Sequence, residues 1–343
     1  MTYKADKLRY ESMIYRKAGK NGLRLPIISL GLWQNFGGEN TLETQREMLH
    51  TAFDLGITHF DLANNYGTPY GSAELNFGKI FHQDLRQYRD EIIISTKAGY
   101  DMWPGPYGQK GSSRKYLLAS LDQSLKRLKL DYVDIFYSHC FDKETPLEET
   151  AGALASAVTQ GKTLYVGISS YPSSKTIEIA NILSKYNIPL LVNQSSYNMF
   201  NRWIELKLLN ICEKYGVGII AFSTLAQGLL TKKYSNYNLN NMLLKTLSRS
   251  TISPTDLSIE NLTRIKYLEK IAKKRNQTLA QMALSWVLRD TRITSTLIGA
   301  SSCTQIRENV DILKNLTFNK EELIEIDSFA IDGSVNFGRQ QEI

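Results

Sequence analysis

The segment EIIIST, residues 91–96, is followed by RKYLLASLDQSLKRLKL, residues 114–130, and then by YVDIFYS, residues 132–138. The first and third segments are short apolar runs, which is typical of strands buried on both faces of a sheet. The middle segment places leucine every three or four residues, as an amphipathic helix does. Strand, helix and strand in this order predict a parallel pair of strands with the helix packed over them.

The same alternation extends over most of the chain. A hairpin is predicted at SMIYRKAGKNGLRL, and further strands at 27–32, 57–60, 163–169, 189–194, 218–222 and 295–300. A segment of helical period follows each strand, and eight strand–helix units in sequence predict an α/β fold, a closed (β/α)8 TIM barrel, rather than a doubly wound sheet. The barrel carries an N-terminal β-hairpin and a C-terminal extension. No linker or low-complexity run occurs, so residues 1–343 are interpreted as a single domain.

One long irregular region, Leu230 to Asp256, interrupts this pattern and is rich in Asn, Ser, Thr and Tyr. A segment of this length is either a surface loop or, on the functional face of a barrel, a lid. Both interpretations stay open on the sequence.

The composition indicates a globular protein without a membrane span or a disulfide framework. The 343 residues carry a formal charge of +7, and no apolar run approaches the roughly 20 residues that would cross a bilayer. Cys140, Cys212 and Cys303 lie far apart, which favours a reducing, cytoplasmic location. We find no nucleic-acid motif, basic stripe or metal-ligand spacing, and therefore expect no nucleic-acid partner, no membrane contact and no metal.

Polar residues stand where three neighbouring strands end. Asp61 follows the second strand, Lys97 the third and His139 the fourth, with Tyr66 five residues beyond Asp61. The active sites of such barrels lie at the C-terminal ends of the strands, so these side chains are expected to converge. A buried Lys97 cation paired with Asp61 is expected to lower the pKa of the Tyr66 phenol toward working pH. A proton donor beside a histidine that orients an oxygen is suited to carbonyl reduction.

The segment GVGIIA, residues 216–221, formally fits the glycine pattern of dinucleotide-binding folds. That pattern must follow a strand and open a helix. Here the glycines close a predicted helix and open a strand, so we interpret them as a turn.

Several motifs together resemble the aldo-keto reductase family, in order and over essentially the whole chain. They are FDLANNYG, ISTKAG, DIFYSH, VGISS, NQSSYN, FSTLAQG and LIGASSCTQIRENV. The segments GLW, DMWPGPYG and RKYLLASLDQSLKRL look most like the branch of bacterial L-glyceraldehyde 3-phosphate reductases, which is similar to the β-subunits of voltage-gated potassium channels.

The resemblance implies a catalytic set and an extended NADPH across the barrel mouth. Asp61 and Lys97 would tune Tyr66 as the proton donor, His139 would position the carbonyl, and Trp33 would line the substrate pocket. The implied cofactor contacts, with Trp33 and Asp61, are Ser169, Ser170, Gln194, Phe222, Ser223, Leu225, Gln227, Lys233, Gly299, Ser301, Gln305, Glu308 and Asn309.

The sequence departs from the family at three of these positions. Ser170 stands where Asn is frequent, and Phe222 stands where Tyr or Trp is commoner. Gln305 replaces a frequent arginine, so the preference for NADP over NAD is open, with Lys245 and Arg249 as candidates to compensate.

The expected function is the NADPH-dependent reduction of small aldehydes such as glyceraldehyde 3-phosphate or methylglyoxal. Two alternatives stay open: a regulatory protein that resembles the channel β-subunits and turns over little substrate, and a lyase that forms a Schiff base on Lys97. The resemblance also implies a possible homo-oligomer.

Overall fold

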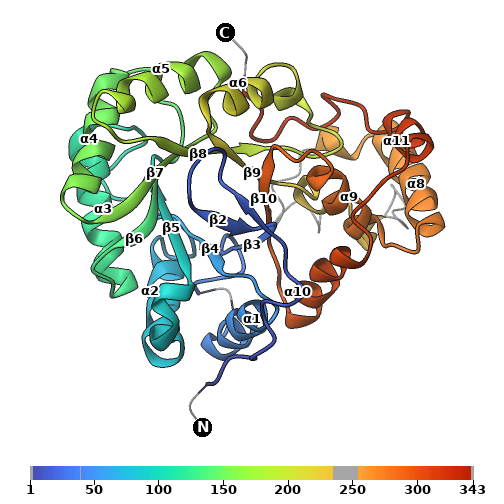
Figure 1. Ribbon diagram of the computed structural model, residues 1–343, viewed down its shortest axis with the longest axis horizontal. Coiled ribbons are helices and arrows are strands. Elements are labelled where there is room, and N and C mark those ends of the chain that lie inside the picture. Colours follow the sequence, from blue (N-terminus) through green and yellow to red (C-terminus); the bar gives the residue numbers. More distant parts are fainter. Residues whose placement is uncertain (1–2, 39, 235–253, 341–343) are drawn as a thin grey trace.

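The computed structural model describes residues 3–38, 40–234 and 254–340. Within them, a closed ring of eight parallel strands runs in the order β10-β3-β4-β5-β6-β7-β8-β9 (Figure 1). This ring confirms the predicted (β/α)8 barrel. Its strands are β3 (Ile28–Gly31), β4 (His59–Asp61), β5 (Ile93–Ala98), β6 (Val133–Ser138), β7 (Thr163–Ser169), β8 (Leu190–Ser196), β9 (Gly218–Phe222) and β10 (Ile293–Ile298).

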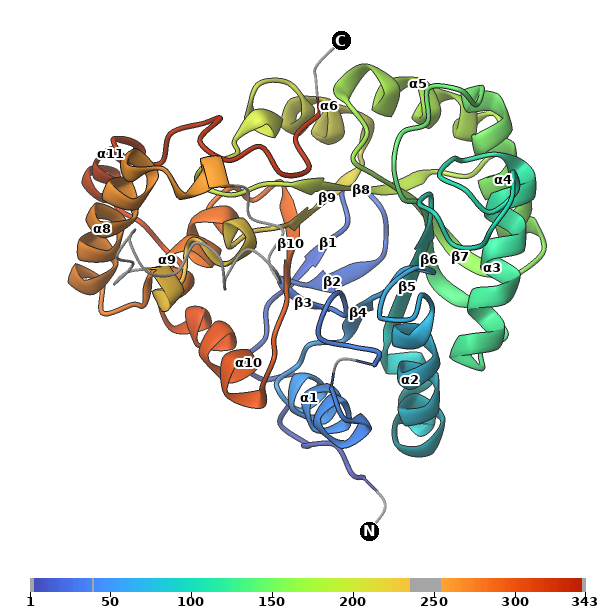
Figure 2. The same cartoon turned by 180° about the vertical axis from the view of Figure 1, so that it is seen from behind.

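Helices surround the ring and bury the outer faces of the strands, and α8 and α11 pack together on the side away from α3 and α4 (Figures 1 and 2). The described helices are α1 (Leu42–Asp54), α2 (Ser72–Ile80), α3 (Arg114–Leu128), α4 (Leu147–Thr159), α5 (Ser173–Ser184), α6 (Leu208–Tyr215), α8 (Ile259–Lys274), α9 (Leu279–Leu288), α10 (Cys303–Val310) and α11 (Lys320–Asp327).

Local signals fix the ends of these helices. The Ser113 hydroxyl accepts from the Tyr116 amide and begins α3, and Lys129 ends it with a left-handed backbone. Gly216 adopts a φ of 74° after α6, and Gly218 is the first residue of β9, as expected for a turn rather than a dinucleotide fingerprint.

Two predicted strands were displaced by two residues, and in addition β4 begins and β8 ends two residues later than predicted. β5 begins at Ile93 rather than Glu91, because a 3-10 turn, Arg86–Glu91, extends to that point and Ile93 pairs with His59 of β4. Lys97 therefore lies within β5 and not after it. β10 begins at Ile293 and ends at Ile298, which leaves Gly299 in the loop above the barrel.

The N-terminal hairpin, β1 (Tyr15–Lys17) and β2 (Arg24–Pro26), lies across the N-terminal end of the barrel (Figure 1). The Arg16 guanidinium donates to the carbonyl oxygens of Ile293, at 2.7 Å, and Leu288, at 3.0 Å. Ala18 and Leu25 are buried in the cluster that fills the barrel, together with Ile135, Tyr137, Leu191, Val192, Ile220 and Leu297. The hairpin thus closes this end.

A glycine lets the largest side chain of this interior cluster fit. A Cβ at Gly167 would lie 2.5 Å from the Tyr137 ring, which packs across the β7 backbone. Tyr137 is fully buried in consequence.

The long irregular region is described only at its edges, where short 3-10 turns cover Lys232–Tyr234 and Pro254–Leu257. Lys245 and Arg249 lie outside the described residues. In the described part of the chain, no helix is long and apolar enough to cross a membrane, and no three His, Cys, Asp or Glu side chains gather as metal ligands would.

Candidate active site

The ends of β4, β5 and β6 bring the four sequence-predicted catalytic residues together. Asp61 is the last residue of β4, Lys97 lies near the end of β5, and His139 follows β6. Tyr66 lies in the loop after β4, which the Asn64 amide fastens by donating to the Lys97 carbonyl at 2.9 Å. The strand order of the barrel therefore sets the spacing of the site.

Lys97 is fully buried, and each of its ammonium hydrogens has an acceptor within reach. It forms an ion pair with Asp61, donates to the Leu62 carbonyl oxygen at 2.7 Å, and reaches the Tyr66 hydroxyl at 3.3 Å. The site thus couples an ammonium–carboxylate pair directly to a phenol.

The Asp61 carboxylate is held on both of its oxygens. The Ser95 hydroxyl donates to Oδ1 at 2.7 Å and the Gln194 amide donates to the same oxygen at 3.1 Å, while Lys97 binds Oδ2. These three donors fix the orientation of the carboxylate.

The expected lowering of the Tyr66 pKa was wrong for this site. Burial raises the pKa of Tyr66 well above 10, and the nearby Asp61 and Tyr100 raise it further. The sequence argument weighed only the Lys97 cation, whereas desolvation penalises the phenolate and Asp61 offsets the ammonium. Burial also lowers the pKa of Lys97. The phenol therefore keeps its proton at neutral pH.

His139 is a neutral imidazole in this environment. Burial, and then the charge of Lys97, hold its pKa well below 6.5. Its ring stands edge-on to Tyr66, with centroids 5.8 Å apart, and to Tyr100, with centroids 4.7 Å apart. Its Nδ1 is buried without a hydrogen-bond partner in the described residues. A hydrogen on Nε2 is the tautomer that leaves no N–H donor buried and unpaired.

A cavity of about 1010 Å³ opens at the C-terminal ends of the strands, and Tyr66 and His139 line it. Every residue that the resemblance assigned to the cofactor also lines this cavity. They are Trp33, Asp61, Ser169, Ser170, Gln194, Phe222, Ser223, Leu225, Gln227, Lys233, Gly299, Ser301, Gln305, Glu308 and Asn309.

A family model described as the aldo/keto reductase family matches residues 27–331. The chain belongs to this family. It is an oxidoreductase. Two relatives, each called L-glyceraldehyde 3-phosphate reductase, come from Escherichia coli O157:H7 and Escherichia coli strain K12. Each is 57% identical over 339 residues, covering 98% of this chain and 98% of the relative.

The loops of this aldo/keto reductase that follow β7 and β9 line the cavity and adopt left-handed backbones at residues other than glycine. The φ angles of Ser170, Ser223 and Gln227 are 56°, 54° and 57°, and the Gln227 amide donates to the Ser223 hydroxyl. Such conformations cost of order 1–3 kcal/mol each and cluster at ligand clamps. Asn tolerates them better than Ser does, which is relevant to the departure at Ser170.

Gln305 already has a partner at the start of α10. Its side-chain oxygen accepts from the Ser301 amide at 2.8 Å, while the Ser302 hydroxyl caps the helix by accepting from the Gln305 amide. The backbone N–H of Ser301 is therefore already bonded to the side chain of Gln305, the residue that replaces the frequent arginine.

Sequence reasoning missed several residues that line the same cavity. Tyr100 follows β5 and packs on His139, and Phe337 stacks on Trp33 with centroids 6.2 Å apart. Asn65 precedes Tyr66, and its buried Oδ1 lacks a partner in the described residues. Asn65 and Tyr100 were findable from their places beside catalytic positions, whereas no local pattern marks Phe337.

The C-terminal segment 328–340 of the aldo/keto reductase returns to the mouth of the barrel. The Ser196 hydroxyl, at the end of β8, donates to the Phe337 carbonyl at 2.7 Å. A Cβ at Gly338 would lie 2.9 Å from the Phe222 ring. The segment thus covers one edge of the aromatic residue at the end of β9.

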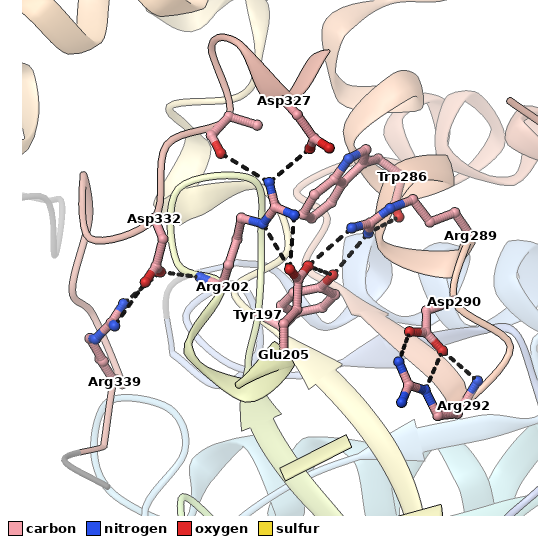
Figure 3. Close-up of polar contacts among 11 residues, drawn as sticks. Tyr197, Arg202, Glu205, Trp286, Arg289, Asp290, Arg292, Asp327, Asp332 and Arg339 are labelled. Atoms are coloured by element: carbon pink, nitrogen blue, oxygen red, sulfur yellow. Dashed lines mark hydrogen bonds and ion pairs between the residues drawn. The ribbon is translucent and has the colours of Figure 1, made fainter. Parts of the chain in front are cut away.

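Charged side chains fasten this segment (Figure 3). Arg202 pairs with Asp327 at 2.7 Å, and its backbone amide donates to Asp332 at 2.6 Å. Arg339 pairs with the same Asp332 through both of its terminal nitrogens. Arg339 also donates to the Asn201 side-chain oxygen at 3.4 Å, so the C-terminal extension is tied to the loop after β8 on both sides of Phe337.

Proposed function

We propose that the protein reduces small hydroxylated aldehydes with NADPH, and that Tyr66 supplies the proton to the carbonyl oxygen. The observation that supports this most is the Tyr66 hydroxyl, 3.3 Å from the buried Lys97 ammonium and facing a cavity that His139 also lines. The relatives named L-glyceraldehyde 3-phosphate reductase support the aldehyde class.

The residues that line the cavity fit a nicotinamide cofactor. Phe222 offers an aromatic face at the end of β9, and Gly299 leaves open space where a side chain would stand. NADPH, when bound, supplies the hydride. Ser169 and Gln194 would hold its carboxamide, and Ser223, Leu225, Gln227 and Lys233 its pyrophosphate, while Ser170 contributes beside Ser169. Gly299, Ser301, Gln305, Glu308 and Asn309 would hold the adenosine end.

The proton chemistry follows from the charges. Tyr66 enters the reaction protonated, because burial raises its pKa well above 10. As negative charge develops on the carbonyl oxygen, the phenol gives up its proton, and the Lys97 ammonium stabilises the phenolate that remains. The neutral His139 donates a hydrogen bond to the same oxygen and orients it.

Amide side chains indicate the substrate class. Gln34, Asn35 and Asn65 line the cavity beside Trp33 and Tyr66. The buried Oδ1 of Asn65 has no partner in the described residues, and such an acceptor is costly unless a ligand satisfies it. A hydroxyl next to the aldehyde, as in glyceraldehyde or its phosphate, offers a suitable donor. Methylglyoxal lacks this hydroxyl and is expected to be the poorer substrate.

The two other candidate functions are weaker. A Schiff-base lyase needs a free amine, but Lys97 is fully buried and bonded to Asp61 and Leu62. A regulatory protein with little turnover does not need the complete set of Tyr66, Lys97 and His139. We further propose that the protein is a single domain, lies in the cytoplasm and forms a homo-oligomer. Analytical ultracentrifugation would test the oligomeric state.

Steady-state oxidation of NADPH and of NADH with an aldehyde panel tests this function. We expect turnover with glyceraldehyde 3-phosphate and glyceraldehyde, and a higher KM for propanal, which lacks the hydroxyl. A tightly bound cofactor without turnover of any aldehyde would favour the regulatory alternative. Gln305 predicts that NADH also binds, because this side chain carries no positive charge for the 2′-phosphate that distinguishes NADPH from NADH.

A further inference from the structure

A chain of polar side chains runs through the barrel interior and ends on Asp61. The Ser295 and Ser29 hydroxyls lie 2.7 Å apart, and Ser29 lies 2.9 Å from Nδ1 of His59. Nε2 of His59 lies 3.0 Å from the Ser95 hydroxyl, which donates to Asp61 at 2.7 Å. All four members before Asp61 are fully buried. We call Ser295, Ser29, His59 and Ser95 the interior chain.

The single hydrogen of each hydroxyl fixes the direction of every bond. The Ser95 hydroxyl donates its hydrogen to Asp61, so the Ser95 oxygen must accept a hydrogen bond from Nε2 of His59. A neutral imidazole carries one hydrogen, which leaves Nδ1 as an acceptor for Ser29. Ser29 then accepts from Ser295. Every donor in the interior chain therefore points toward Asp61.

The alternating geometry of strands explains how four strands supply this chain. His59 and Asp61 are two apart on β4, and Ser95 and Lys97 are two apart on β5, so each pair faces the same side. Asp61 pairs with Ser95 in the register between the two strands. Ser29 on β3 and Ser295 on β10 continue the polar row around the barrel.

Burial of a polar group in the barrel interior lowers stability unless the group has a hydrogen-bond partner. Apolar residues would fill the same space without this requirement. His59 is neutral, because burial lowers its pKa to about 4. The charged groups that face it are Asp61, from its own strand, and Lys97, from β5. The interior chain thus acts on the active site through dipoles and not through a charge of its own.

We propose that His59 is a positioning residue, which through Ser95 holds the Asp61 carboxylate in the orientation that keeps Lys97 against Tyr66. The idea rests on the proposed function of the Tyr66 site. Without the donor from His59, the Ser95 hydroxyl is free to rotate away from Asp61, and Oδ1 then keeps only the longer bond from Gln194, at 3.1 Å, among the described side chains. The contact that we expect to lengthen joins the Lys97 ammonium to the Tyr66 hydroxyl. At 3.3 Å it is already the longest of the three hydrogen bonds that Lys97 donates.

A double-mutant cycle between His59 and Ser95 tests the proposal. We expect His59→Leu to lower kcat for glyceraldehyde by roughly tenfold, which corresponds to a barrier increase of about 1.4 kcal/mol, with the Kd of NADPH unchanged. His59→Gln keeps a donor toward Ser95 and should restore most of the rate. In a Ser95→Ala background, His59→Leu should cost little further, because the link is already cut.

The outcomes separate positioning from packing. Additive losses in the cycle, or equal losses in His59→Leu and His59→Gln, would overturn the proposal. If His59→Leu does not fold, Ser29→Ala, the milder change at the far side of the imidazole, takes its place and should still lower kcat. A wild-type enzyme that reduces no aldehyde would instead contradict the proposed function.

The tautomer provides a readout that does not depend on turnover. In protein labelled with ¹⁵N-histidine, we expect the buried His59 to carry its hydrogen on Nε2 and to lack one on Nδ1. A hydrogen on Nδ1 would reverse the direction of the interior chain and overturn the proposal.

Discussion

Lys97 is the residue on which the site depends most, because it is both fully buried and charged. Its ion pair with Asp61 offsets the desolvation of both groups, and neither charge could persist alone in this environment. The ion pair thus has two effects. It holds a cation beside Tyr66, and it compensates the free-energy cost of burying that cation in the barrel.

Removal of one partner should therefore cost more stability than removal of both charges. We predict that Lys97→Met lowers the free energy of unfolding by about 3–5 kcal/mol, since Asp61 is left buried without its cation. Asp61→Asn combined with Lys97→Met should recover a large part of this loss while remaining inactive. Urea unfolding of the two variants makes the comparison, and equal stabilities would contradict the buried pair.

Individual residues also show where sequence reasoning stops. The positions of Asp61, Tyr66, Lys97 and His139 at one mouth were predictable, because strand ends of a barrel share a face. The direction of the Tyr66 pKa was not, since it depends on how completely water is excluded. His59 lies in the predicted strand 57–60, where no role is expected for it, although its spacing of two from Asp61 is visible in the sequence.

Among the elements, the C-terminal segment 328–340 lines the cavity together with the strand ends. It contributes Phe337 to the cavity, and its position depends on Arg202 in the loop after β8 (Figure 3). Arg202 pairs with Asp327, just before the segment, and its backbone amide donates to Asp332 within it. Asp332 is the central anchor, because it binds both the Arg202 amide and the Arg339 guanidinium. Loosening this anchor should free Phe337 from Trp33.

We predict that Asp332→Asn raises the KM for glyceraldehyde several-fold and changes kcat little, because Tyr66, Lys97 and His139 stay in place. Trp33 fluorescence should shift as Phe337 leaves it. Asp122→Asn on α3 is the matched control, since Asp122 pairs with Lys162 on the outside of the barrel. An unchanged KM in Asp332→Asn, or an equal change in the control, would contradict a role for the segment in substrate binding.

The elements were predictable to different degrees. Strands β7 and β9 follow their apolar runs residue by residue, whereas β5 and β10 were misplaced by two residues. Apolar content cannot distinguish Ile92, which follows the 3-10 turn, from Ile93, which begins the strand, because both are isoleucines in one apolar run. The return of the C-terminal segment depends on contacts between residues far apart in sequence, such as Arg202 with Asp327, which no local pattern encodes.

For the molecule as a whole, two neutral histidines in the interior couple stability to pH. Burial lowers the pKa of His59 to about 4 and that of His139 well below 6.5. The unfolded chain binds protons at these histidines near pH 6.5, whereas the folded protein does not. Stability is therefore fully present above that pH and is lost as the pH falls.

We predict that the contribution of His59 to this loss is on the order of 3 kcal/mol between pH 6.5 and pH 4. Carboxylates also destabilise the protein in this range, so the difference between wild type and His59→Gln isolates the histidine. Urea unfolding at several pH values measures it. Parallel curves for the two proteins would contradict a buried neutral His59.

The architecture of the whole molecule was predictable because it repeats: eight apolar strands, each with its covering helix, leave little choice but a closed barrel. Three features were not predictable from the sequence: the cavity size, the bond to the Ser301 amide and the interior chain. Each depends on which side chains meet across the ring.

Replacement of Tyr66 by phenylalanine tests the central claim most directly. Single-turnover oxidation of NADPH with glyceraldehyde, together with a cofactor titration, separates chemistry from binding. We predict that Tyr66→Phe slows hydride transfer by at least about a hundredfold, as expected for loss of a general acid, with the Kd of NADPH nearly unchanged. A rate close to wild type, or a parallel loss of cofactor binding and rate, would contradict Tyr66 as the proton donor.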